Sequence, residues 1–227
     1  HVTRHLIYSR FWNRFLYDIG VVPNAEPYAK RTAQGLILGP DGVKMSKSRG
    51  NVIDPNDVVD EYGADVLRTY VLFMGDYEKA APWSEKSVKG MKRFMDRTWA
   101  LQDMLADGDE YTADLQSSMH KTIKKVSEDI ENMKFNTAIA ALMTLLNQFY
   151  DKGSVNRAEL KTYLQLLNPF APHMTEEIWA EQNFGGMVCE SEWPSYDEAK
   201  CVDDVVEIAV QVNGKVRARI SVASDIS

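Results

Sequence analysis

Two lysines three residues apart, in a stretch rich in hydroxyls, are the residues of this chain best suited to chemistry on a phosphate. The stretch reads Lys44-Met45-Ser46-Lys47-Ser48, and glycines stand on both sides of it. A glycine-rich backbone can turn tightly and bring its N–H groups close to a ligand. Lysine carries a compact charge, and preorganised donors stabilise the charge that builds on a leaving phosphate. The alternative is a solvated Lys/Ser loop, which explains most isolated segments of this kind.

Further landmarks extend this pattern over almost all of the chain. They are Asn51-Val52-Ile53-Asp54-Pro55, Tyr62-Gly63-Ala64-Asp65, Trp83-Ser84, Asn168-Pro169-Phe170-Ala171-Pro172-His173 and Gln211-Val212-Asn213-Gly214-Lys215-Val216-Arg217. Residues 44–48 resemble the KMSKS signature of class I aminoacyl-tRNA synthetases. Taken together, the landmarks are most similar to bacterial leucyl-tRNA synthetases.

The resemblance implies a reaction for the full-length protein. Leucine is activated with ATP to leucyl-adenylate and transferred to tRNA(Leu), with ATP and Mg²⁺ as cofactors. Lys44 and Lys47 are the catalytic candidates, both directed at the ATP phosphates, and Lys47 is the stronger of the two. Ser46 and Ser48 are expected to order the loop.

Three more positions are assigned to the ATP site by the resemblance. The backbone at Val43 and Met45 is expected to contact the adenine, and His1 falls where the family has a histidine near the adenosine. His1 and His5 lie four residues apart, but no third metal ligand is evident, so no metal site is predicted. The chain starts in mid-pattern without Met, which suggests a fragment that is inactive alone.

Composition limits the remaining classes. With 227 residues, 44% hydrophobic and 26% charged, the chain is typical of a globular protein. Its net charge of −7 argues against indiscriminate nucleic-acid binding, so RNA must meet a local basic face. No stretch is apolar enough for a membrane span. Cys189 and Cys201 are read as free thiols in a reducing cytoplasm, and the resemblance implies a monomer.

The elements that must position these groups are mostly helices. The fold class expected is mainly α: a helical bundle of the synthetase anticodon-binding type, attached to a remnant of a Rossmann-like α/β catalytic core and ending in a β-hairpin stub. The predicted domains are 1–60 with the catalytic loop, 61–185 with the helices, and 186–227 as connector and start of a tRNA-binding domain. Asn213-Gly214 predicts the hairpin turn.

One predicted helix, from Ser84 to about Leu105, carries a basic stripe opposite its apolar face. The stripe consists of Lys86, Lys89, Arg93 and Arg97, spaced three and four residues apart. It is either a contact for tRNA phosphates or a solvated face paired with nearby acids. A smaller basic patch is expected at Lys121, Lys124 and Lys125.

Several local expectations follow from spacing alone. Asn136 is expected to cap an apolar helix, and Asn156 with Glu159 predicts a capping box. Trp99 is assigned to an apolar helix face. His173 is taken as a helix-start residue without an acid partner.

Two other functions stay open: another class I synthetase specific for valine, isoleucine or methionine, and a non-catalytic tRNA-binding module.

Overall fold

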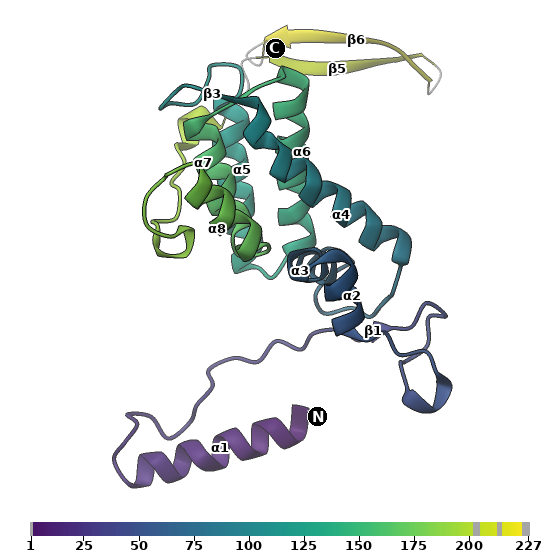
Figure 1. Cartoon of the computed structure of the whole chain (residues 1–227), viewed down its shortest axis with the longest axis vertical. Coiled ribbons are helices and arrows are strands. Elements are labelled where there is room, and N and C mark those ends of the chain that lie inside the picture. Colours follow the sequence, from purple (N-terminus) through teal and green to yellow (C-terminus); the bar gives the residue numbers. More distant parts are fainter. Residues whose placement is uncertain (1, 202–204, 213–214, 224–227) are drawn as a thin grey trace. The chain divides into compact units, whose positions relative to one another are not determined.

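The computed structural model describes residues 2–201, 205–212 and 215–223, the last two ranges by their backbone (Figure 1). The chain separates into two compact units, residues 1–34 and 35–227. The first contains helix α1 (Val2–Asp18) and the extended segment after it. Arg10 and Asn13 of α1 tie this segment back, through Glu26 and through the carbonyls of Asn24 and Ala25. His1 lies outside the described residues.

The second unit begins with a short strand and a loop. Strand β1 (Ile37–Leu38) pairs in parallel with β2 (Ala81–Pro82), and the loop between residues 39 and 51 contains the 3-10 turn η1 (Lys47–Arg49). Two helices follow, α2 (Pro55–Tyr62) and α3 (Ala64–Phe73). Asp54 caps α2, because its carboxylate accepts the Asn56 N–H at 2.9 Å.

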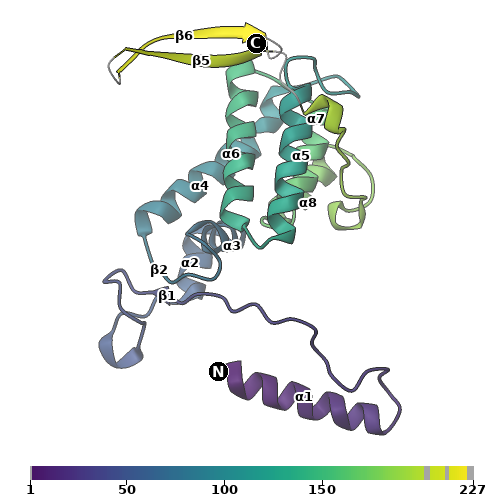
Figure 2. The same cartoon turned by 180° about the vertical axis from the view of Figure 1, so that it is seen from behind.

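Five helices form what we call the bundle. They are α4 (Glu85–Trp99), α5 (Gln116–Glu131), α6 (Phe135–Lys152), α7 (Arg157–Leu167) and α8 (Pro172–Glu181). Figure 2 shows α5 and α6 side by side, joined by a tight turn. The 3-10 turn η2 (Ala100–Met104) and strands β3 (Leu105–Ala106) and β4 (Val155–Asn156), which pair in parallel, link its segments.

The bundle's core is apolar and continuous with buried residues of α2 and α3. Inward positions of every bundle helix are buried, including Met91, Ile123, Leu146, Leu164 and Trp179. This pattern matches the helical spacing of apolar residues in the sequence. The mainly α class is therefore confirmed.

The end of the described chain is a connector and a hairpin. The connector holds two 3-10 turns, η3 (Val188–Glu190) and η4 (Glu198–Lys200). Strands β5 (Val205–Val212) and β6 (Lys215–Ala223) then pair antiparallel, as expected, with a register shift after Val210. The predicted turn residues, Asn213 and Gly214, lie outside the described residues.

Two local predictions were wrong. Asn136 is not a cap, because α6 starts earlier, with Lys134 at its N-cap and Met133 in a left-handed conformation (φ 58°) that closes the turn before it. Trp99 is 42% exposed, because α4 ends there and the chain tightens into η2. The capping box at Asn156 and Glu159 was predicted correctly.

Candidate functional site: the lysine loop and the basic face of helix α4

The backbone of residues 39–51, which we call the lysine loop, closes on itself through hydrogen bonds. Gly39 N–H donates to the Val43 carbonyl at 2.8 Å, and Lys44 forms an antiparallel bridge with Leu38. Arg49 N–H donates to the Ser46 carbonyl at 3.0 Å within the 3-10 turn. The two lysines therefore stand on a backbone of defined shape.

Asn51 braces this loop from its far end. Its amide oxygen accepts the Ser46 N–H at 2.8 Å, and its amide nitrogen donates to the Asp41 carboxylate at 3.3 Å and to the Lys44 carbonyl at 3.5 Å. One side chain thus connects the beginning, middle and end of the loop. Sequence reasoning missed this role, although an Asn beside a Gly-rich loop is a known turn former.

Glycine is required where this brace passes closest to the backbone. A Cβ on Gly39 would lie 2.6 Å from an Asp41 carboxylate oxygen and 2.9 Å from the Asn51 amide nitrogen. Gly42 and Gly50 have φ values of 72° and 67°, which side chains rarely adopt. The glycines noted in the sequence therefore serve the turns and the close approach.

Lys44 and Lys47 are both exposed. Within the part of the chain that the structure describes, neither ammonium has an ion-pair partner. Ser46 and Ser48 hydroxyls hydrogen-bond each other at 2.9 Å, consistent with the ordering role expected of them. The loop presents two hydrated cations on a braced backbone, an arrangement that suits a phosphate ligand.

Met45 and Val43 differ in their surroundings. The Met45 side chain is partly buried and packs against the hydrophobic core, whereas Val43 is 38% exposed. Packing of Met45 anchors the loop between its two lysines. The contact of these backbones with adenine stays a prediction.

The basic stripe of α4 is in the expected place, but its members differ. Lys86, Lys89 and Arg93 are exposed and have no ion-pair partner among the described residues. Arg97 instead lies over the Tyr150 ring, 4.2 Å from its centroid, and donates to the Asn147 side chain at 2.8 Å. Three cations of the stripe are therefore available to a ligand, and the fourth packs against α6.

The smaller patch on α5 is largely neutralised. Lys125 pairs with Asp129, and Lys124 pairs with Glu198 of the connector and lies near the Tyr196 ring. The Glu198 hydrogen bond, the main cause, raises the pKa of Lys124. This patch holds the connector rather than presenting free charge.

His173 has an acid partner that sequence reasoning missed. The buried Asp65 carboxylate lies 2.7 Å from His173 Nδ1 and also accepts the Met174 N–H at 2.7 Å. Arg68 and Thr69, on the same face of α3, donate to the carbonyls of Pro169 and Phe170. These contacts join residues more than 100 positions apart and hold α3 against the turn before α8. His173 therefore has a structural role, since it helps to hold these two helices together.

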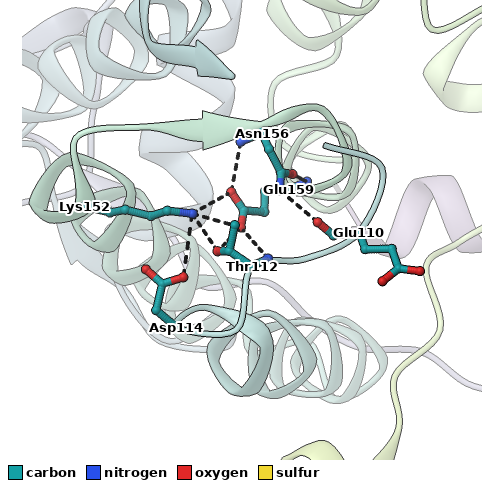
Figure 3. A network of polar contacts seen from close by, with 6 residues as sticks. All are labelled: Glu110, Thr112, Asp114, Lys152, Asn156 and Glu159. Carbon is teal, nitrogen blue, oxygen red and sulfur yellow. Dashed lines mark hydrogen bonds and ion pairs between the residues drawn. The ribbon is translucent and has the colours of Figure 1, made fainter. Parts of the chain in front are cut away.

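A buried polar network lies elsewhere in the bundle (Figure 3). Glu159 is fully buried and accepts the Thr112 hydroxyl at 2.6 Å, the Thr112 N–H at 3.0 Å and the Asn156 N–H at 2.9 Å. Lys152 Nζ lies 3.3 Å from the same carboxylate. Burial opposes ionisation of Glu159, but these donors and Lys152 outweigh it and lower the pKa.

A groove of about 760 Å³ also lies in the bundle. Its walls include Tyr111, His120, Arg157, Lys161 and Lys200, and no residue of the lysine loop. The described residues contain no group of three or more His, Cys, Asp or Glu side chains that could hold a metal ion. Helices long and apolar enough to cross a membrane are likewise absent from them.

Comparison with known proteins assigns both halves of the chain. Residues 113–227 match the family of the anticodon-binding domain of tRNA ligase, and residues 8–84 match class I tRNA synthetases for I, L, M and V. The chain belongs to the class I tRNA ligases that carry this anticodon-binding domain.

Individual relatives point to one amino acid. The chain is 56% identical, over its whole length, to a leucine–tRNA ligase of Alkaliphilus oremlandii, and 47% identical over 98% of its length to that of Bdellovibrio bacteriovorus. It spans 28% of the length of each. A crystal structure of the AgnB2 LeuRS of Agrobacterium radiobacter, in ternary complex with tRNA and LeuAMS, is also similar to this chain. The match covers all of this chain and 31% of the LeuRS chain, with 32% sequence identity and a TM-score of 0.76. The expected similarity to bacterial leucyl-tRNA synthetases is confirmed.

Proposed function

We propose that this chain supplies the phosphate-binding loop and the helical domain of a leucine–tRNA ligase. In the full-length protein, the leucine carboxylate attacks the α-phosphate of ATP, and pyrophosphate leaves. A hydroxyl at the 3′ end of tRNA(Leu) then attacks the leucyl carbonyl carbon, the ester bond forms, and AMP leaves as the acyl–phosphate bond breaks. The observation that carries the proposal is the pair of exposed, unpaired lysines on a backbone braced by Asn51.

The lysines act through charge. Phosphoryl chemistry requires positioning and electrostatic stabilisation more than covalent help. Lys47 and Lys44 bind the departing phosphates, and Lys47 supplies the larger share. Val43 and Met45 offer backbone groups to the adenine, and Ser46 and Ser48 keep the turn ordered.

The described residues do not by themselves form a Mg²⁺ site. Mg²⁺ is commonly held by one or two carboxylates together with substrate phosphates. We therefore assign none of its ligands, and no step, to these residues.

Removal of the stronger lysine tests the proposal. Lys47→Ala in the full-length protein should slow adenylate formation by roughly 10²–10³-fold, the usual cost of losing one preorganised donor. Leucine affinity should change far less. Single-turnover formation of leucyl-adenylate measures both, and Lys134→Ala, which removes an exposed lysine of the bundle, is the matched control. A normal rate with weakened leucine binding would contradict the assignment.

Leucine specificity and the fragment's inactivity need their own assay. Pyrophosphate exchange by the full-length protein should depend on leucine and not on valine, isoleucine or methionine. The isolated 227-residue chain should show none, because residues 1–60 are expected to form only one side of an ATP site. Leucine-dependent exchange by the isolated chain would overturn that second expectation.

The exposed cations of α4 are proposed to contact tRNA phosphates. Each phosphate contact adds roughly 0.7–0.9 to the slope of log affinity against log salt. Lys89→Gln with Arg93→Gln should therefore weaken tRNA binding and reduce the slope by about 1.4–1.8, while Lys124→Gln on the paired α5 patch should not. An unchanged slope would favour a merely solvated face.

A further inference from the structure

The lysine loop is attached to the bundle at two points that lie next to each other. On the entry side, the carbonyl of Leu38 accepts the Trp83 N–H at 3.0 Å, where β1 pairs with β2. On the exit side, α2 ends at Tyr62, whose hydroxyl donates to the Glu85 carboxylate at 2.7 Å. Trp83 and Glu85 are two residues apart at the start of α4.

Glu85 joins these two attachments directly. Its second carboxylate oxygen accepts the Trp83 indole N–H at 3.3 Å, while the first holds Tyr62. Trp83 is nearly buried, and its ring meets Tyr70 edge to face with centroids 4.8 Å apart. The Tyr70 hydroxyl in turn accepts the Ser84 N–H at 2.8 Å. The carboxylate therefore rests on a rigid aromatic support.

From this geometry we propose that Glu85 is a positioning residue that clasps both ends of segment 39–61 and so fixes where Lys44 and Lys47 stand. The inference rests on the proposed function, because it gives these lysines the ATP phosphates as their target. Glu85 does not touch substrate. Its hydrogen bond is the main cause that raises the pKa of the Tyr62 hydroxyl.

A simpler role for Glu85 must be separated from this one. An acidic residue in the first turn of a helix is favourable beside the helix dipole, and Ser84 already caps α4. That role needs only a negative charge and would be kept by Glu85→Asp. The clasp needs the longer side chain, since it must reach Tyr62 and Trp83 together, so it would be lost in Glu85→Asp.

The test is leucine-dependent pyrophosphate exchange by the full-length protein. Tyr62→Phe, which removes one oxygen atom, should lower kcat/KM for ATP roughly 3–10-fold, as expected for one hydrogen bond. Glu85→Asp should lower it at least as much, because the shorter side chain cannot reach Tyr62 and Trp83 together, and the KM for leucine should not move. Glu131→Gln, an exposed acid at the end of α5, is the control.

Combination of the changes distinguishes the clasp from general damage. The Tyr62→Phe/Glu85→Asp double variant should be no worse than Glu85→Asp, because both changes remove the hydrogen bond between positions 62 and 85. Multiplicative losses, or wild-type kcat/KM in Tyr62→Phe and Glu85→Asp, would overturn the inference. If Glu85→Asp melts early, Tyr62→Phe alone decides. Absence of exchange in the wild-type protein, or normal exchange in Lys47→Ala, would instead count against the proposed function.

Discussion

In the lysine loop, hydrogen bonds join residues two to ten positions apart and stay open to solvent, whereas in the bundle the buried Glu159 carboxylate binds Thr112, 47 positions away. The loop thus keeps its lysines exposed, and without ion-pair partners among the described residues, on a locally closed backbone. The bundle pairs its buried charges, because an unpaired charge there would be costly. The groups available for chemistry are therefore those that the fold does not use for its own stability.

The largest effect should come from the bundle's buried carboxylate. Glu159→Ala leaves Lys152 and the Thr112 and Asn156 N–H groups without their shared acceptor. Loss of one partner of a buried pair typically costs about 3–5 kcal/mol of the free energy of unfolding. Urea unfolding of the chain measures it, and Glu177→Ala, at an exposed position of α8, should stay within about 0.5 kcal/mol. Equal losses of stability in both variants would show that the buried Glu159 carboxylate stabilises the bundle no more than an exposed acid does.

A second prediction concerns pH. Because the pKa of Glu159 is lowered in the folded chain, its ionised form stabilises the fold. This contribution is fully present above the ordinary carboxyl pKa and is lost as pH falls through the lowered value. Stability measured by urea unfolding between neutral and acidic pH should therefore fall less steeply in Glu159→Gln than in the wild-type chain. Parallel curves would show that another group controls acid unfolding.

The loop should respond to substitution in activity and not in stability. Asn51→Ala removes the acceptor of the Ser46 N–H and the donor to Asp41. One net hydrogen bond is worth about 0.5–1.5 kcal/mol, so adenylate formation by the full-length protein should slow roughly 3–10-fold. Because the Asn51 contacts join only loop residues, their loss should change the shape of the loop without unfolding the bundle, and the global free energy of unfolding should change by less than about 0.5 kcal/mol. A large loss of stability with normal kinetics would reverse the proposed difference between the regions.

The two regions also differ in how far sequence predicted them. The capping box at Asn156 and Glu159 was visible because its partners are three residues apart and follow a known pattern. The same Glu159 also binds Thr112 and Lys152, and nothing in a single sequence pairs residues 47 positions apart. The Asp65 contact with His173 was missed for the same reason.

The loop lysines were recognised by residue type and motif, yet the brace that holds them was not. Lys44 and Lys47 carry their chemistry in their side chains, so the sequence alone indicates it. Asn51 acts through geometry, since its amide must reach Ser46 and Asp41 at once. Arg97 shows the converse: its charge predicted a ligand contact, but it lies over the Tyr150 ring, which only tertiary packing determines.

The smallest effect on stability is expected at an exposed ion pair. It tests whether burial or position in the bundle determines how much a charged group stabilises the fold. Lys124 of α5 pairs with Glu198 of the connector, 74 positions away, but the side chain of Glu198 is 68% exposed. If long-range position in the bundle were what stabilises, Glu198→Gln would cost as much as changes at Glu159. If burial decides, the cost is the small one of an exposed ion pair. We expect the small cost, and we expect it to shrink further in high salt, because solvent ions screen an exposed pair.

Urea unfolding of Glu198→Gln and Glu159→Gln at low and high salt measures the loss of stability and its salt dependence. A salt-independent loss in Glu198→Gln as large as that in Glu159→Gln would show that attachment of the connector, rather than burial, determines the contribution to stability.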